Sequence, residues 1–262
     1  MKLITLNIWG GQVYKPLIRF LKKYSKEIDI FCFQEVFKSD RNIFHNDIRT
    51  NVYLDIAKVL NDYNGYFSPI FERYDTKQEV DFELFFGQAT FVKKTINVLS
   101  SGDVFVYGTY GQEKVKPKRH HEEFGEFFDF PRNLHYLEIE KDKKERLIAN
   151  VHGFWVPESK EDTPERLEQS DKILKFLNSY KFGKILCGDF NLNPATKSML
   201  MLEKGMVNLI KKYNIQSTRS NLHTRKDKLA DYILVSKDIQ VLDFKVMKDQ
   251  VSDHLPLFLE FK

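Results

Sequence analysis

The stretch KILCGDFNLNPATK, residues 184–197, joins an apolar run to a carboxylate and a carboxamide. Residues 185–187 form the kind of short apolar run that a covered β-strand shows. Asp189 and Asn191 follow with one residue between them, so their side chains point to the same side of an extended chain. A carboxylate can take a proton, and a neutral carboxamide can donate to an anionic oxygen. The pair therefore suits chemistry on an anionic substrate.

Polar side chains also stand at the ends of five further predicted strands. Each alone has a structural explanation, since Asn7 could cap a turn, Glu35 could cap a helix and GDFN could form a turn. Together they indicate a cleft, because polar groups at strand ends gather at the open edge of an α/β sandwich. The full set comprises Asn7, Gln34, Glu35, His152, Asp189, Asn191, Asp231, Asp253 and His254.

Four of these residues are carboxylates, namely Glu35, Asp189, Asp231 and Asp253. Crowded together without a cation, they would repel one another and raise one another's pKa. A hard divalent cation would remove that repulsion. The donor set is rich in oxygen and lacks a cysteine cluster, which favours Mg²⁺, or else Mn²⁺, over Zn²⁺.

The elements that must position these residues alternate between strands and helices. Strands are predicted over 2–7, 28–36, 184–187, 230–236, 239–247 and 255–261, and helices over 15–27, 51–63, 163–180 and 198–204. Residues 87–94 and 96–108 resemble one β-hairpin, and residues 134–153 form a clearer one around a charged turn at 142–144. This order predicts an α/β fold in which two mixed β-sheets lie between helices.

The composition is that of an ordinary globular protein, with 42% hydrophobic and 30% charged residues. We expect a single domain over residues 1–262, because no repeat or linker interrupts the chain. The net charge of +4 permits an anionic partner without requiring one. Cys32 and Cys187 lie in apolar runs, which indicates buried, reduced thiols. With neither a signal-peptide pattern nor an apolar run long enough for a membrane helix, we expect a cytoplasmic protein, and a monomer.

The segments LNIWGG, CFQEV, GQATFVKK, ANVHG, CGDFNLNP, ADYILVS and SDHLPLFLEF, in this order, resemble the endonuclease/exonuclease/phosphatase superfamily of magnesium-dependent phosphoesterases. The resemblance runs from residue 3 to residue 261, and GDFN together with SDH is its most specific part. It implies a four-layered α/β sandwich, with two mixed sheets packed face to face and flanked by helices. It also implies hydrolysis of a phosphoester by an activated water.

The resemblance further implies a role for each residue. Glu35 would be the main metal ligand, with Asn7 and Asp253 nearby. Asp189 would orient or deprotonate the attacking water, and Asn191 would hold a phosphate oxygen. Asp231 would orient His254, which would contact the phosphate or act as acid or base. His152 matches a second active-site histidine of many members. The division is physically sound, because a carboxylate behind an imidazole fixes its tautomer and stabilises its charged form.

Two basic segments bear on the substrate. Residues 111–133 begin with cations that include Lys116 and end with phenylalanines, and residues 217–232 place Arg225 shortly before Asp231. Cations and aromatic rings together suit nucleic acid, so Lys116 and Arg225 are predicted to bind substrate. The same segments could be solvated turns, and the phenylalanines could contact a lipid surface. A nuclease or nucleotide phosphodiesterase is thus the preferred function, with a sphingomyelinase-like phospholipid phosphodiesterase as the alternative. A catalytically inactive binding module is the third possibility, and the intact motif set argues against it.

Overall fold

The structure is a computed structural model that describes residues 1–75, 77–110, 119–121, 125–127, 130–157 and 159–262. The predicted substrate-binding residue Lys116 lies outside these ranges. The described strands of the protein are β1 (Lys2–Asn7), β2 (Ile30–Ser39), β3 (Phe44–His45), β4 (Ile48–Arg49), β5 (Tyr63–Glu72), β6 (Leu84–Lys93), β7 (Asn97–Tyr107), β8 (Arg119–His121), β9 (Gly125–Phe127), β10 (Arg132–Lys141), β11 (Lys144–His152), β12 (Gly183–Asp189), β13 (Met206–Asn208), β14 (Asp231–Ser236), β15 (Val241–Val246) and β16 (Leu257–Phe261). The helices are η1 (Trp9–Gly11), α1 (Tyr14–Tyr24), α2 (Val52–Val59), α3 (Pro164–Asn178), α4 (Lys197–Leu202) and α5 (Leu209–Lys212).

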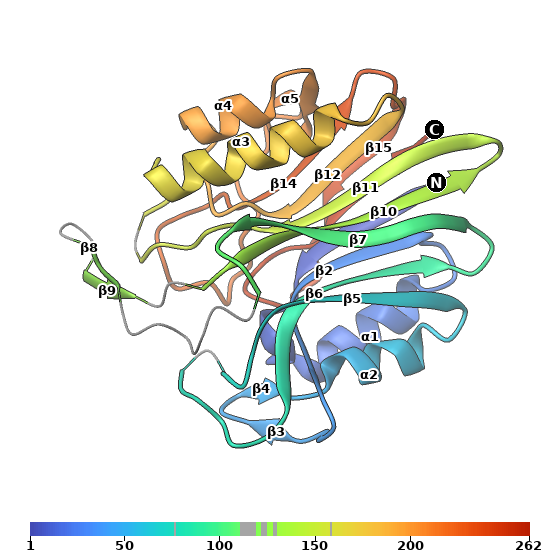
Figure 1. The fold of residues 1–262 in the computed structure, drawn as a ribbon. Helices are drawn as coiled ribbons and strands as arrows, with labels where there is room; N and C mark the ends of the chain where they lie inside the picture. Colours follow the sequence, from blue (N-terminus) through green and yellow to red (C-terminus); the bar gives the residue numbers. More distant parts are fainter. Residues whose placement is uncertain (76, 111–118, 122–124, 128–129, 158) are drawn as a thin grey trace.

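Two mixed six-stranded sheets pack face to face, with helices on both outer sides (Figure 1). The first sheet has the order β15-β16-β1-β2-β6-β5, and the second has the order β13-β14-β12-β11-β10-β7. One pair in each sheet is parallel, β1 with β2 and β11 with β12. Helices α1 and α2 cover the first sheet, and α3, α4 and α5 cover the second (Figure 1). The predicted four-layered α/β sandwich is confirmed.

The strand sequences explain why both faces of each sheet are covered. Leu3 and Ile4 are neighbours on β1, yet Leu3 packs in the core between the sheets and Ile4 packs against the helices. Both side chains are fully buried, because successive residues of a strand point to opposite faces. Helix α3 begins as its sequence predicts, with the Thr163 side chain accepting from the Arg166 backbone N–H and Pro164 in the first turn.

The predicted hairpin over 87–94 and 96–108 is wrong. Strands β6 and β7 are consecutive in the chain but belong to different sheets, β6 between β2 and β5 and β7 beside β10. Strands β2 and β5 already occupy both edges of β6. Strand β5, which was not predicted from the sequence, takes the place that a hairpin partner would need. The second predicted hairpin is confirmed as β10 and β11.

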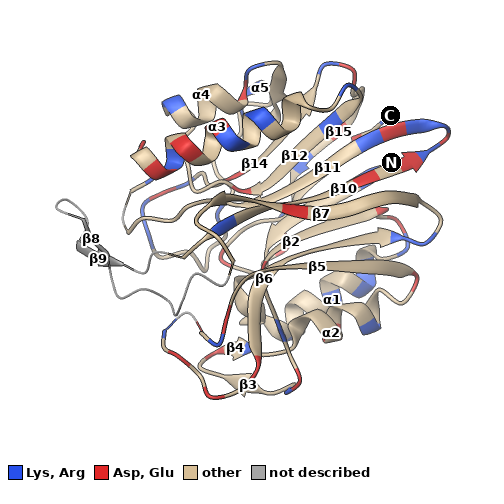
Figure 2. Ribbon diagram, viewed as in Figure 1, with Lys and Arg blue, Asp and Glu red and all other residues tan. Residues whose placement is uncertain are grey.

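Charged residues of both signs are mixed over the outer surface of the described chain. Lys and Arg stand beside Asp and Glu along α3 and near the turn between β10 and β11 (Figure 2). In α3 the exposed pairs Lys172–Glu168 and Lys175–Asp171 have N···O distances of 2.7 and 2.6 Å. Such mixed surfaces attract no particular polyanion, so the cations that matter for a substrate are those around a pocket. Among the described residues, no helix is long and apolar enough to cross a membrane.

Candidate active site

The strand pairing brings polar residues of both sheets to one edge of the sandwich. Asn7 ends β1 and pairs with Gln34 of β2. In the second sheet, Asp189 at the end of β12 lies between His152 of β11 and Asp231 of β14 in register. Because the parallel strands end at the same edge, an amide, an imidazole and two carboxylates gather there as the sequence pattern predicted.

A β-bulge turns Glu35 toward this edge. The pairing of β2 with β6 shifts register between Phe33 and Val36, and Glu35 has a φ of 55°. Gln34 points between the sheets instead, where its Nε2 donates to Asn150 Oδ1 at 2.6 Å. A left-handed φ at a non-glycine residue costs of the order of 1–3 kcal/mol, so the surrounding sheet must maintain this conformation. The bulge thereby places a carboxylate where regular alternation would not.

Asn7 joins the carboxylates of the two sheets. Its Nδ2 donates to Glu35 Oε1 at 2.9 Å and to Asp189 Oδ2 at 3.1 Å. The Asn7 amide is held in this orientation because its Oδ1 accepts from the Trp9 backbone N–H at 3.0 Å. The other oxygen of Asp189 accepts from the Asn191 backbone N–H at 3.0 Å. The Asp189 carboxylate is therefore fixed in position by donors on both oxygens.

The GDFN turn depends on the glycine before Asp189. Gly188 has a φ of 133°, and a Cβ there would lie 2.0 Å from the Val151 carbonyl oxygen. Only glycine fits so close to the neighbouring strand. After the turn, Asn191 adopts a left-handed φ of 54°, a conformation that asparagine tolerates better than most residues.

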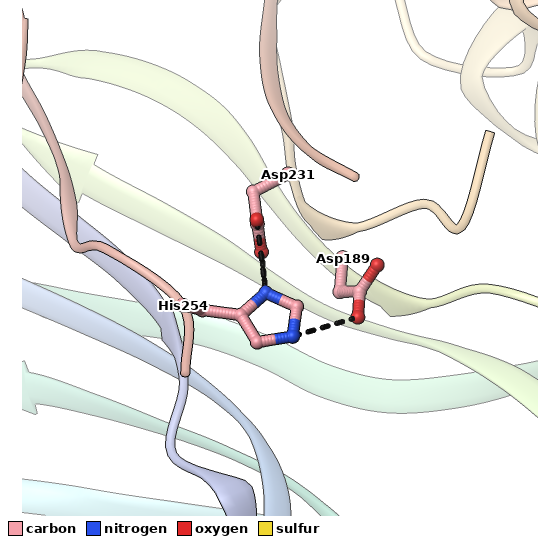
Figure 3. Close-up of side chains that lie close together, drawn as sticks. All are labelled: Asp189, Asp231 and His254. Atoms are coloured by element: carbon pink, nitrogen blue, oxygen red, sulfur yellow. Dashed lines mark hydrogen bonds and ion pairs between the residues drawn. The ribbon is translucent and has the colours of Figure 1, made fainter. Parts of the chain in front are cut away.

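Asp231 and His254 form a buried pair beside Asp189 (Figure 3). His254 Nδ1 lies 2.8 and 2.9 Å from the two oxygens of Asp231. Thr218 Oγ1 donates to Asp231 Oδ2 at 2.7 Å and holds the carboxylate behind the ring. The other ring nitrogen, His254 Nε2, lies 3.7 Å from Asp189 Oδ2. The geometry thus matches the predicted pairing, in which a carboxylate orients an imidazole.

The charges around this group shift its pKa values in opposite directions. Burial lowers the pKa of His254, but nearby carboxylates, Asp231 above all, outweigh it and raise the pKa to about 9. Arg219, whose Nη1 contacts His254 Nε2, opposes that rise. Burial disfavours the charged form of Asp189, yet His254 and Lys160 outweigh it and hold the pKa of Asp189 far below its ordinary value. An anion and a cation therefore face each other at neutral pH.

His152 behaves differently. Burial, helped by the charge of Arg132, lowers the pKa of His152 to about 3, so its ring is neutral at physiological pH. Its Nε2 lies 3.7 Å from Glu35 Oε1 and 3.9 Å from Asp189 Oδ2. Its Nδ1 is buried without a hydrogen-bond partner among the described residues. His152 can therefore supply a hydrogen bond at the site but not a permanent positive charge.

The site has the donor groups that a hard cation needs. Burial raises the pKa of Glu35 to about 7, and repulsion from Asp253 and Asp189 adds to this, while the Asn7 hydrogen bond opposes it. The Glu35 side chain is 24% exposed, so water at the site moderates the shift. A cation would favour the ionised form, and the carboxylate and amide oxygens suit Mg²⁺ or Mn²⁺. The site therefore fits a hard divalent ion.

A tighter group in the same place could also hold a metal ion. Asp189, Asp231 and His254 are all buried, and each offers a ligand atom within 4.8 Å of the others. However, Asp231 and His254 already bind each other through His254 Nδ1. An ion between them would have to replace that hydrogen bond.

Glu35, Asp189 and His254 line a pocket of about 560 Å³ with two unlike walls. One wall is apolar and contains Phe71, Phe86 and Phe130, whose rings stack with centroids 4.7 and 4.2 Å apart. The other wall is polar and carries the carboxylates of Glu35, Asp189 and Asp253 together with the cations Arg132, Lys160, Arg219 and Arg225. The pocket therefore offers an anion site beside a surface for rings or aliphatic groups.

Comparison with known proteins identifies the family of the chain. Residues 4–254 match the Endonuclease/Exonuclease/phosphatase family. The chain belongs to the endonuclease/exonuclease/phosphatase family. As a member with a buried Asp–Asp–His group, it is a phosphoesterase. No curated protein matches the chain in sequence.

Solved structures of the endonuclease/exonuclease/phosphatase family share the fold at low sequence identity. The mannosyl-6-phosphatase Bt3783 of Bacteroides thetaiotaomicron is 17% identical, with a TM-score of 0.69 over 100% of this chain and 99% of its own. The human Nocturnin catalytic domain with a bound sulfate anion is 16% identical, with a TM-score of 0.67 over 100% and 94%. A humanised D. rerio TDP2 is 15% identical, with a TM-score of 0.65 over 100% and 98%.

Most of the predicted site residues surround the pocket of this family member. The lining includes Glu35, His152, Asp189, Asn191, Asp253 and His254, while Asn7 and Asp231 lie just behind it. Arg225 is exposed at the pocket, and its guanidinium lies 5.3 Å from the centre of the Trp155 ring. The roles of these residues remain predictions.

The sequence pattern did not single out Lys160, His223 or Asp227, and it gave Arg219 no role beyond its place in the basic segment 217–232. Asp227 Oδ2 accepts from Arg219 Nη2 at 2.7 Å, and Asp227 Oδ1 lies 3.1 Å from His223 Nε2. His223 Nδ1 in turn lies 3.5 Å from Asp253 Oδ2. The only signal in the sequence was the position of this polar loop directly before Asp231. Nothing in the sequence indicated that Lys160 enters the pocket.

Proposed function

We propose that the protein is a phosphodiesterase that requires Mg²⁺ or Mn²⁺ and acts on nucleic acid or a nucleotide-containing phosphodiester. The observation that carries the proposal is the Asp231–His254 pair facing an ionised Asp189 in a pocket that also contains Glu35 and Asp253. The pocket is built from strand ends of both sheets, which also supports a single domain over residues 1–262.

We propose that Glu35 and Asp253, with Asn7 beside them, would hold the metal ion. When bound, the ion would neutralise phosphate charge and stabilise the leaving oxygen. Asn7 contributes through its amide nitrogen, which donates to Glu35 and keeps that carboxylate in place. Its Oδ1 accepts one hydrogen bond from the Trp9 backbone N–H and keeps a second lone pair for the metal ion.

Asp189 acts on the attacking water. Its lowered pKa keeps it ionised, but it also makes Asp189 a weak base. We therefore propose that Asp189 orients the water by accepting its hydrogen bond and takes the proton as the oxygen–phosphorus bond forms. The fixed position of the carboxylate between Asn7 and the Asn191 backbone supports this role.

We propose that His254 meets the phosphate as a cation. Its raised pKa favours the protonated ring at neutral pH, and Nε2 can donate to a phosphate oxygen or to the leaving oxygen once Arg219 Nη1, which contacts it in the structure, turns to the phosphate instead. Asp231 fixes the ring through Nδ1 and stabilises its charge, and Thr218 fixes Asp231. Asn191 has one carboxamide N–H bonded to the Gly153 carbonyl at 3.1 Å, and the other can donate to a non-bridging oxygen.

The pocket walls support a nucleotide-containing substrate. Arg225 and Trp155 at the pocket suit a phosphate and a base, and the phenylalanine wall suits a ring. The same apolar wall would accept a lipid chain, so sphingomyelin remains the alternative substrate.

A substrate panel tests the proposal. Single- and double-stranded DNA, RNA, sphingomyelin vesicles, inositol phosphates and a sugar 6-phosphate are each incubated with Mg²⁺, with and without EDTA. The Asp189→Asn variant serves as the control for contaminating activity. We expect EDTA-sensitive turnover to be fastest on a nucleic acid. Faster turnover of the sugar phosphate or the lipid would overturn the substrate assignment, and full activity in EDTA would overturn the metal requirement.

A further inference from the structure

Lys160 is a buried cation in the pocket with few hydrogen-bond acceptors. Its residue is 7% exposed, and its Nζ donates to Asn191 Oδ1. An ammonium group has three N–H donors, and among the described residues no second acceptor lies within hydrogen-bond distance of this one. Since an unsatisfied buried charge is costly, the two remaining donors need water or a ligand. The pocket is where either would lie.

The loop that carries Lys160 is held firmly by a second buried cation. Arg166, at the start of α3, is fully buried and donates to three backbone carbonyls of this loop. The acceptors are Phe154 at 3.2 Å, Ser159 at 2.9 Å and Glu161 at 2.6 Å. The Lys160 carbonyl itself accepts from the Asn193 backbone N–H at 2.9 Å, which ties the loop to the segment after Asn191. Four hydrogen bonds to backbone carbonyls thus hold the chain around Lys160 in place.

Balancing the charge of Asp189 is only part of what Lys160 can do. Asp189 and Asp227 attract the ammonium, but Arg219 and Arg166 repel it, so charges of both signs already surround it. Both oxygens of Asp189 also accept hydrogen bonds from Asn7 and Asn191. Burial lowers the pKa of Lys160 to about 8, which leaves the group mainly charged at neutral pH. The ammonium therefore remains available to an additional anion.

We infer that Lys160 binds a non-bridging oxygen of the substrate phosphoryl group directly, next to the oxygen held by Asn191. The inference rests on the proposed phosphoesterase function. It gives Lys160, which lies beside Asn191, the role of binding the charge of the phosphoryl group. Lys160 is a substrate-binding residue in this assignment, and its contact with Asn191 places both donors on the same phosphoryl group.

Titration with inorganic phosphate in the presence of Mg²⁺ tests the assignment without any substrate turnover. Isothermal titration calorimetry is done on the wild type, Lys160→Met and Lys181→Met. Lys181 is an exposed lysine beyond the end of α3 that does not line the pocket, so its variant is the matched control. Loss of one charge-assisted hydrogen bond should weaken phosphate binding about tenfold in Lys160→Met and leave Lys181→Met unchanged. Equal affinity in the wild type and a folded Lys160→Met would overturn the assignment. Lys160→Gln replaces Lys160→Met should the latter unfold.

A double-mutant cycle separates direct binding from an effect through Asn191. kcat/KM is measured for Lys160→Met, Asn191→Ala and the double variant on the best substrate of the panel. If Lys160 touches the phosphate, Lys160→Met still lowers kcat/KM about tenfold in the Asn191→Ala background. No further loss would mean that Lys160 only positions Asn191, and the assignment would be wrong. Weakened phosphate binding in a protein that cleaves no phosphodiester would instead contradict the proposed function and leave the assignment standing.

Discussion

Replacing Asp231 with asparagine should change the pH dependence of the reaction more than its maximum rate. The substitution keeps the shape of the side chain and an oxygen for His254 Nδ1, but it removes the negative charge behind the ring. That charge is the strongest of the effects that raise the pKa of His254 to about 9. Without it, burial and Arg219 still lower the pKa of His254, while Asp253 and Asp189 still raise it. The pKa should therefore fall from about 9 toward the ordinary value of about 6.5.

The sign and size of the effect follow from these two pKa values. His254 is protonated below its pKa, so a reaction that needs the protonated ring loses rate as the pH rises through that pKa. At about pH 8 roughly nine-tenths of wild-type molecules carry the proton, against roughly 3% of molecules with a pKa of 6.5. Protonation alone should thus slow Asp231→Asn about 30-fold at that pH, and less in more acidic buffer.

The assay is a profile of kcat/KM from about pH 5.5 to about pH 10 with saturating Mg²⁺. Asp238→Asn, at an exposed aspartate just beyond the other end of β14, is the matched control and should keep the wild-type profile. The reasoning would be refuted if Asp231→Asn lost rate by the same factor at every pH, or if its basic limb coincided with that of the wild type.

Three further predictions test the metal site, the loop and the substrate. Glu35→Gln should abolish most Mg²⁺ stimulation. Because protons compete for the partly buried wild-type carboxylate, the apparent Mg²⁺ affinity of the wild type should fall by up to about tenfold per pH unit below about 7. Mg²⁺ titrations at several pH values check this, and pH-independent affinity would contradict it. Arg166→Met should lower the free energy of unfolding in urea by about 3–5 kcal/mol, because it leaves three carbonyls, two of them buried, without their donor. Arg19→Met on the exposed face of α1 is the control, and an equal, small loss in both would argue against the loop network. Arg225→Ala should reduce turnover of a short single-stranded nucleic acid and make that turnover less sensitive to salt, while turnover of sphingomyelin vesicles stays unchanged. If lipid turnover were faster and did not depend on Arg225 or Lys116, the phospholipid phosphodiesterase function would be favoured instead.

The sequence was most informative where a polar residue stood at the end of a regular, apolar strand. Asp189 follows an apolar run, and Asp231 begins one, so their meeting at one edge follows from strand direction. Glu35 was found through its motif, whereas the bulge that aims it could not be predicted, because a register shift depends on pairing with β6. Strand β7 was assigned to the wrong partner, since a hairpin pattern does not reveal that β5 already occupies the edge of β6.

Lys160 shows a different limit. The loop that carries Lys160 shows no periodic spacing of apolar residues. Its position is set by hydrogen bonds from Arg166 to backbone carbonyls, and because every residue has a carbonyl, such bonds cannot be recognised from residue types. The cytoplasmic location and the monomeric state remain predictions from the sequence.

The division of the site between two sheets explains why its residues are spread over the whole chain. Asn7 and Glu35 come from the first sheet, and Asp189 and Asp231 come from the second. The Asn7 hydrogen bond to Asp189 crosses the gap between the sheets, and the Gln34–Asn150 hydrogen bond crosses it deeper in the core. An amide of the first sheet therefore helps to fix the Asp189 carboxylate of the second. The packing of the two sheets is therefore part of the catalytic geometry, and the first and last strands have to be neighbours in the same sheet for His254 to reach Asp189.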